Sequence, residues 1–301
     1  MHIPVLVNEV IEFLKPENGK TYVDATIGCG GYTEKLLSLC PNCKVIGIDW
    51  DSAAIDFSKE RLKHYIEKGN LIIVKQNFIN IKEIIAELKI NTIAGAMFDF
   101  GFSTLQIKSG RGFSFNDEIL DMRMDPSQTV LTASYILNNY SEKQLYEIFL
   151  KYGEERYSKF IAKEIVEYRK NKQINSAKDL IEIFKKISKP KNKEIFLKDK
   201  KQKLKFKFNP ITKILQALRI FINNELYNIE VGLNNTIDIL SSKGRIVAVS
   251  YHSLEDRIVK NIFRKRNDIK IITKKPVTPK SEEILNNISS RSAKLRAAEK
   301  L

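Results

Sequence analysis

Two aspartates and three closely spaced glycines are the residues of this sequence best suited to hold a ligand. Asp24 ends the apolar run TYVD, and Gly28, Gly30 and Gly31 follow within seven residues. Asp49 ends a second apolar run, KVIGID, eighteen residues after Gly31. In a nucleoside site the glycines let the backbone approach the ligand, and the second acid accepts the ribose hydroxyls. The pattern therefore predicts a nucleoside cofactor at the edge of a doubly wound sheet.

The spacing of the glycines bears on which nucleoside this is. A dinucleotide fingerprint has a third glycine where this chain has Thr33, and it places a pyrophosphate at the helix N-terminus. Adjacent glycines preceded by an acid favour S-adenosylmethionine, which has no phosphate and whose cationic amino-acid end suits a carboxylate such as Asp24. A nicotinamide dehydrogenase and a glycine turn without a ligand remain the alternatives at this stage.

Three further side chains follow predicted strands. Asp99 ends the fourth strand, where it faces the cofactor's amino-acid end or an incoming amine, or else caps the next segment. Phe78 follows the third strand and either stacks on an adenine or belongs to the core. After the fifth strand, Ser253 and Asp256 predict a capping box. His252, one of three histidines, is then left at the sheet edge as a catalytic or a structural residue.

The order of the elements predicts an α/β domain with an insertion. Strands are expected at 22–25, 45–49, 71–75, 93–99 and 245–250. The apolar run of the fourth strand is continuous rather than alternating, which is typical of a strand covered on both faces. Between the fourth and fifth strands a long loop at about 101–131 is expected, followed only by helices, the last of them a single long helix at 212–240. Residues 1–107 and 209–301 are therefore assigned to the α/β domain, and 108–208 to an inserted helical domain that recognises the substrate.

Composition and charge restrict the class of protein. The 301 residues carry a net charge of +15, and residues 185–207 hold eleven lysines against Glu194 and Asp199. A phosphate-contacting surface is the preferred interpretation, with a solvated loop as the alternative. No apolar run approaches the length of a membrane span. Three cysteines cannot pair completely, which favours a reducing, cytoplasmic location.

Several sequence blocks, taken together, are similar to those of one family. They are HIPVLVNEV, GCGGYT, GIDWD, DFGFSTLQ, RGFSF, LDMRMDP, YGEERYSKFIAKEIVEYR, LQALRIFINNEL and SYHSLEDRIVKNIF, in this order along nearly the whole chain. The sequence thereby resembles the bacterial 16S rRNA cytosine-N4 methyltransferase family, ribosomal RNA small subunit methyltransferase H.

The resemblance implies a fold, a reaction and a set of contacts. The fold is a class I S-adenosylmethionine-dependent methyltransferase, a Rossmann-like doubly wound sheet with an inserted all-helical domain. The reaction is N4-methylation of a decoding-centre cytidine, the C1402-equivalent of 16S rRNA in the small ribosomal subunit, with a homodimer as a further possibility. The implied cofactor contacts are Gly30, Gly31, Tyr32, Asp49, Phe78, Asp99 and Gln106. Tyr32 stands where many members have histidine.

The reaction would require a partner for the poorly nucleophilic exocyclic amine. Asp99, Ser103 and His252 are the candidate acceptors for its hydrogens. One alternative is a non-enzymatic RNA-binding assembly factor with a vestigial cofactor site. A DNA amino-methyltransferase is another, although such enzymes commonly have a D/N-P-P-Y/F tetrapeptide where this chain has Asp99-Phe100-Gly101-Phe102.

Overall fold

The computed structural model describes residues 4–101, 104–127, 129–187 and 210–301, and the chain divides into two compact units. The sheet unit comprises Met1–Ser103 and Leu226–Leu301, and the helical unit comprises Thr104–Glu225. The helical unit thus extends beyond the predicted insertion, 108–208, at both ends. The lysine-rich segment lies almost entirely outside the described residues.

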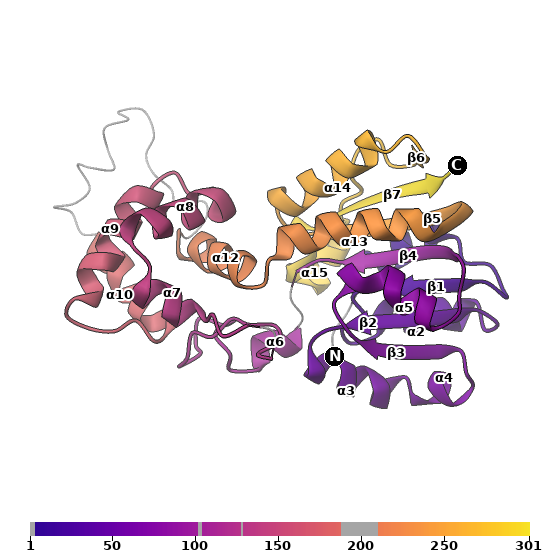
Figure 1. Ribbon diagram of the computed structural model, residues 1–301, viewed down its shortest axis with the longest axis horizontal. Coiled ribbons are helices and arrows are strands. Elements are labelled where there is room, and N and C mark those ends of the chain that lie inside the picture. The colour runs from indigo at the N-terminus through magenta and orange to yellow at the C-terminus, as the bar shows by residue number, and fades with distance from the viewer. Residues whose placement is uncertain (1–3, 102–103, 128, 188–209) are drawn as a thin grey trace. The chain divides into compact units, whose positions relative to one another are not determined.

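The sheet unit contains a seven-stranded sheet in the order β3-β2-β1-β4-β5-β7-β6 (Figure 1). Its strands are β1 (Thr21–Asp24), β2 (Lys44–Asp49), β3 (Leu71–Lys75), β4 (Ile93–Asp99), β5 (Leu240–Ser250), β6 (Ile269–Ile271) and β7 (Lys294–Lys300). The first five strands run parallel, and β7 is antiparallel to both β5 and β6. The carboxyl ends of β1, β2, β4 and β5 therefore meet at one edge.

Helices cover both faces of the sheet because alternate strand residues point to opposite sides. Tyr22 belongs to one core cluster and Val23 to the other. The first face packs against α1 (Val7–Leu14), α2 (Gly31–Leu39), α3 (Ser52–Arg61) and α4 (Lys63–Glu67). The second face packs against α5 (Ile81–Glu87), α13 (Glu225–Ile239) and α14 (Ser253–Lys265). β4, whose apolar run is continuous, is thus covered on both faces, as predicted.

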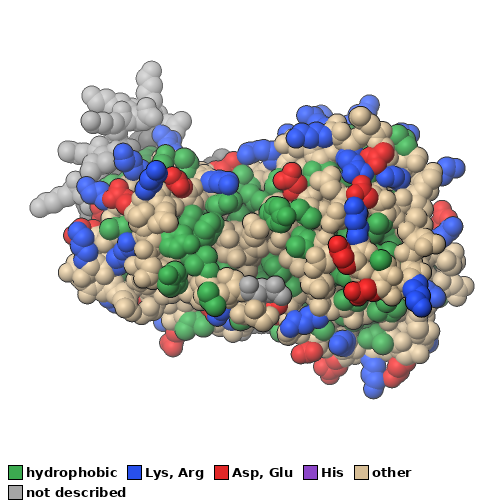
Figure 2. Space-filling model, viewed as in Figure 1, with side chains coloured by type: hydrophobic (Ala, Val, Ile, Leu, Met, Phe, Trp, Pro, Cys, Tyr) green, Lys and Arg blue, Asp and Glu red, His purple; other side chains and the backbone are tan. Residues whose placement is uncertain are grey.

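The remaining short elements of the sheet unit are η1 (Phe78–Asn80), α15 (Ser281–Asn286) and η3 (Ile288–Ser292). In the described ranges, no helix has both the length and the apolar character that a membrane crossing requires. On the face shown in Figure 2, basic and acidic side chains are intermingled over the sheet unit. This face of the unit therefore offers no broad surface of a single charge.

The helical unit has a core of its own. The helices of this unit are α6 (Thr104–Lys108), α7 (Ala133–Asn139), α8 (Glu142–Gly153), α9 (Ser158–Arg169), α10 (Ala177–Ile187) and α12 (Pro210–Ile222). Buried residues of α7 to α12 form the core, together with Leu120 and Met122. Ser141 and Gln144 form the capping box of α8. A Cβ on Gly153 would lie 2.9 Å from the carbonyl oxygen of Lys213, so the end of α8 and α12 approach each other closely.

The prediction of one long helix at 212–240 is wrong. The chain forms α12 and α13, and Asn224 between them has a φ of 51°. Asparagine adopts this left-handed conformation more readily than most residues. The guanidinium of Arg219 donates to both carboxylate oxygens of Glu225 across the break, at 2.8 and 3.0 Å. Apolar periodicity continues through the break, so it gave no signal of a bend.

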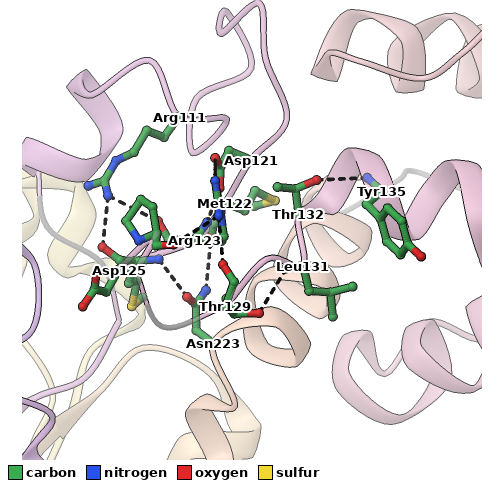
Figure 3. A network of polar contacts seen from close by, with 12 residues as sticks. Arg111, Asp121, Met122, Arg123, Asp125, Thr129, Leu131, Thr132, Tyr135 and Asn223 are labelled. Atoms are coloured by element: carbon green, nitrogen blue, oxygen red, sulfur yellow. Dashed lines mark hydrogen bonds and ion pairs between the residues drawn. The ribbon is translucent and has the colours of Figure 1, made fainter.

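The Met122-Arg123-Met124 run is held by a polar network within the helical unit (Figure 3). The Arg123 guanidinium donates to both oxygens of Asp121, each at 2.7 Å. The side-chain amide of Asn223 accepts from the N–H of Met124 at 2.8 Å and donates to the carbonyl of Met122 at 2.9 Å. Both methionine side chains are buried. The run therefore anchors the loop before α7.

Candidate active site

Three aspartates end adjacent strands at one edge of the sheet. Asp24 ends β1, Asp49 ends β2 and Asp99 ends β4. Because these strands are parallel and neighbours, their carboxyl ends lie together, and the Asp24 charge acts on Asp99 while the Asp49 charge acts on Asp24. The sequence prediction of an acidic edge is thus realised in the structure.

Asp24 is the most deeply buried of the three acids. Its Oδ2 accepts a 2.7 Å hydrogen bond from the hydroxyl of Thr33, and both side chains have no exposed surface. Its Oδ1 makes no hydrogen bond to any described residue. Burial raises the pKa of Asp24 to about 7, against the lowering effect of the Thr33 hydroxyl. A buried carboxylate oxygen without a donor suits a cationic ligand group.

Asp49 is tied to the glycine turn. Its Oδ2 accepts from the N–H of Gly28 at 2.9 Å, and its Oδ1 accepts from the N–H of Asp51 at 3.0 Å. Burial raises the pKa of Asp49 to about 6, although both backbone donors favour the ionised form. A carboxylate has about four acceptor positions, so its oxygens can also accept ribose hydroxyls.

The sequence pattern predicts that the glycines of the turn allow a close approach of the backbone to a ligand, whereas the structure gives two of them a packing explanation. Gly30 has a φ of 77°, and a Cβ there would lie 2.5 Å from Cδ1 of Leu62. A Cβ on Gly31 would lie 2.9 Å from Pro4. Internal packing therefore accounts for these two glycines. Gly28, with a φ of 50°, has no side chain within 4 Å of its Cβ position, so its side of the turn is open.

Asp99 lies among tyrosines. Its Oδ1 accepts a 2.7 Å hydrogen bond from the hydroxyl of Tyr251, and its N–H donates to the Thr26 hydroxyl at 2.7 Å. The Tyr32 hydroxyl donates to the carbonyl of Val5 at 2.5 Å and also favours the ionised form of Asp99. Burial nevertheless raises the pKa of Asp99 to about 7.

Phe78 belongs to an aromatic cluster beside β4. Its ring lies 5.6 Å from that of Phe98 and 6.3 Å from that of Phe100, measured between centroids. A Cβ on Gly232 of α13 would lie 2.4 Å from the Phe78 ring. The ring is partly exposed, so a core role is visible in the structure, while stacking on an adenine stays a prediction.

The predicted capping box of Ser253 and Asp256 is wrong. The N-cap of α14 is His252, whose Nδ1 accepts from the N–H of Glu255, while the Glu255 carboxylate accepts in turn from the N–H of His252. Asp256 instead pairs with Arg296 at 2.6 Å. The imidazole of His252 therefore has a structural task, and a catalytic role for it stays a prediction.

Ser103 and Gln106 are the two remaining residues of the predicted site. Ser103 lies outside the described residues. Gln106 is a buried residue of α6 in the helical unit, and its predicted cofactor contact stays a prediction.

The sequence prediction missed Thr33, Tyr251 and Glu255. The sequence pattern identifies Thr33 only as the replacement for a glycine, yet its hydroxyl, nine residues after the buried strand-end acid, lies in the first turn of α2 and reaches that acid. Tyr251 directly follows β5, and this position next to the parallel β4 is the signal that could have identified it.

The sheet order, the antiparallel β7, the glycine turn after β1 and the strand-end acids define a class I methyltransferase. The chain belongs to the MraW methylase family, whose sequence profile matches residues 1–301. The family and fold class predicted from the sequence are thus confirmed.

Relatives match along the full length of the chain. A protein of Sulfurihydrogenibium azorense is 45% identical over 304 residues, covering 100% of this chain and 99% of its own. A protein of Thermosipho melanesiensis is 45% identical over 302 residues, covering 100% and 98%, and one of Persephonella marina is 43% identical over 304 residues, covering 100% and 99%. All three are named ribosomal RNA small subunit methyltransferase H.

Proposed function

We propose that this protein is an S-adenosylmethionine-dependent rRNA methyltransferase that methylates N4 of a cytidine, the C1402-equivalent, in 16S rRNA of the small ribosomal subunit. The observation that carries the proposal is the end-to-end similarity, at 45% identity, to proteins named as methyltransferases of small-subunit rRNA. The geometry of the three acids supports it.

The residues at the sheet edge fit the methyl donor. Asp24 offers an unpartnered buried oxygen to the ammonium of the donor's amino-acid end. Asp49 is held by Gly28 and Asp51 in a fixed orientation from which it can accept the two ribose hydroxyls. The turn is open beside Gly28, where no side chain fills the space. S-adenosylmethionine, when bound, supplies an electrophilic methyl group on a sulfonium.

Asp99 is the best candidate to receive the hydrogens of the attacking amine. The cytosine amine is a poor nucleophile because its lone pair is delocalised into the ring. Holding it in line with the methyl group contributes several kcal/mol, about 7–11 at the ideal limit. A carboxylate acceptor increases the electron density on the nitrogen as transfer begins. Asp99 is preferred to His252 because the His252 Nδ1 already serves the α14 cap; Ser103 remains a further candidate.

The RNA must present an unstacked base to this edge. Removing a base from a stack costs about a few kcal/mol, and least in single-stranded RNA. The net charge of +15 is suited to a phosphate backbone, and 16S rRNA within the small subunit, in the cytoplasm, is the proposed partner. A homodimer is part of the same proposal.

Methylation assays on three substrates test the proposal. Purified protein and isotopically labelled S-adenosylmethionine are supplied to intact small subunits, naked 16S rRNA and DNA, and the product is mapped by mass spectrometry. The expected product is N4-methylcytidine at the single decoding-centre position. Label on DNA would support a DNA amino-methyltransferase instead. RNA binding without donor binding or label would support a vestigial assembly factor.

A further inference from the structure

Tyr251 connects the end of β5 to the acid at the end of β4. Its hydroxyl donates to Asp99 Oδ1 at 2.7 Å. Its ring covers Gly101, where a Cβ would lie 3.3 Å from Cδ2 of the tyrosine, at a φ of 109°. The absence of a side chain at Gly101 thus gives the ring the space from which its hydroxyl reaches the carboxylate.

The backbone of Tyr251 is fixed by the cap of α14. Glu255, which has no exposed surface, accepts from the N–H of Tyr251 at 2.7 Å and from that of His252 at 3.2 Å. Charge-assisted hydrogen bonds of this kind are stronger than neutral ones. The tyrosine is therefore carried by a rigid turn at a helix N-terminus.

Tyr32 is the second phenol beside Asp99, and its hydroxyl has a further partner. A phenol has one proton to donate, and that of Tyr32 is given to the carbonyl of Val5 at 2.5 Å. A side-chain hydrogen bond also links Tyr32 and Asp99. Of the two hydroxyls, that of Tyr251 is the one whose proton goes to the carboxylate, at 2.7 Å, so it orients Asp99 more strongly.

We propose that Tyr251 is a positioning residue for methyl transfer, whose hydroxyl, held in place by Glu255, aims the Asp99 carboxylate at the amine of the methyl acceptor. The proposal rests on the proposed function, in which Asp99 accepts from that amine.

The side chains around Asp99 shift its pKa, so the positioning role can be measured by titration. Tyr251 and Tyr32 favour its ionised form, while the negative charges of Asp24 and Glu255 disfavour it. Removing the Tyr251 hydroxyl must therefore raise the pKa of Asp99. Neutralising Glu255 must lower it. The two changes act in opposite directions on one carboxyl group.

Three variants test the proposal: Tyr251→Phe, Glu255→Gln and the matched control Tyr22→Phe. The hydroxyl of Tyr22 in β1 accepts from the N–H of Glu17, away from Asp99. The titration of Asp99 is followed by carbon NMR of labelled aspartate, and the pH dependence of kcat/KM is measured with small subunits. In Tyr251→Phe the Asp99 pKa and the acidic limb of the rate profile should both rise by about one pH unit. In Glu255→Gln the Asp99 pKa and the acidic limb should both fall, and in Tyr22→Phe both should keep their wild-type values.

An active wild-type enzyme whose acidic limb is unchanged in Tyr251→Phe would overturn the proposal, as would an equal shift in Tyr22→Phe. An Asp99 titration that Tyr251→Phe leaves in place would also overturn it, whether or not RNA is methylated. Wild-type protein that methylates no RNA would instead refute the proposed function, and the positioning role with it.

Discussion

The hydroxyl of Thr33 lies 2.7 Å from Oδ2 of Asp24, and neither side chain is exposed to solvent. Thr33 occupies the position of the third glycine in a dinucleotide fingerprint. Here its hydroxyl stabilises a buried carboxylate, which a glycine could not do. Thr33, whose presence disfavours a dinucleotide site in the sequence, therefore holds Asp24, the acid that would face the cationic end of the donor.

Thr33→Val should weaken both the fold and donor binding. Valine has the same shape, so the change leaves Asp24 without its side-chain donor, at an expected cost of about 1–3 kcal/mol in unfolding free energy. The pKa of Asp24 should rise further, because the hydroxyl that lowers it is gone. Urea unfolding followed by the fluorescence of Trp50, the single tryptophan, measures the first effect in the sheet unit. Thr33→Ser, which keeps a hydroxyl, should recover most of the loss.

Asp24→Asn should stabilise the protein at neutral and alkaline pH while weakening donor binding. Burial raises the pKa of Asp24 in the folded state to about 7, above its value in the unfolded chain. Between about pH 4 and pH 7 the folded state therefore holds a proton that the unfolded state has released, and stability falls as pH rises. Asparagine does not titrate, so its advantage over wild type should grow through this window to at most about 4 kcal/mol.

Unfolding free energies of both proteins at several pH values check this prediction. A constant difference between them would show that Asp24 titrates normally. A gain in stability with unchanged donor affinity would show that Asp24 does not face the donor.

Gly30→Ala should be far more costly than Gly19→Ala. Both glycines have a left-handed φ, 77° and 79°, so each alanine incurs backbone strain of about 1–2 kcal/mol. At Gly30 the new Cβ would also lie 2.5 Å from Cδ1 of Leu62, whereas at Gly19 nothing lies within 4 Å. Equal losses of stability in the two variants would contradict the packing explanation for Gly30.

The fold was predictable because its signals are local and repeated. Continuous apolar runs identified β3 and β4 at their observed bounds, and Ser141 with Gln144 identified the start of α8. The break between α12 and α13 was not predictable in the same way. It depends on one left-handed residue, Asn224, and on contacts made by Asn223 with residues about a hundred positions earlier.

Asn223→Ala should destabilise the helical unit. The side chain satisfies the N–H of Met124 and the carbonyl of Met122, both in a buried setting, and their loss should cost about 2–4 kcal/mol. Thermal unfolding followed by far-UV circular dichroism measures the change. Asn139→Ala is the control, because that exposed side chain donates to the carbonyl of Tyr135 within its own helix. A control that loses as much as the buried variant would refute the anchoring role of Asn223.

The acids of the site were predictable from the sequence, whereas the neighbouring side chains that shift their pKa values were not. Asp24, Asp49 and Asp99 each end an apolar run, so their common edge follows from the parallel sheet. Tyr251 reaches Asp99 across 152 positions of sequence, a distance over which no spacing rule operates. His252 illustrates the opposite error, since its side chain caps a helix that Ser253 was expected to cap.

Asp99→Ala should abolish donor binding or methyl transfer. The change removes the carboxylate that Tyr251 holds and that we expect to accept from the attacking amine. Equilibrium binding of S-adenosylhomocysteine separates a loss of donor binding from a loss of the chemical step. Normal affinity together with a normal rate would remove Asp99 from the site.

Titration calorimetry of the wild-type protein with S-adenosylmethionine tests the central claim most directly, that the glycine turn and the strand-end acids surround a sulfonium donor. At about pH 8, where Asp24 is ionised, one donor molecule per chain should bind with micromolar affinity. The affinity should fall roughly tenfold or more towards pH 5.5, as the pKa of about 7 requires, and Asp24→Asn should bind weakly at both pH values. Folded protein that evolves no heat with the donor at about pH 8 would contradict the account.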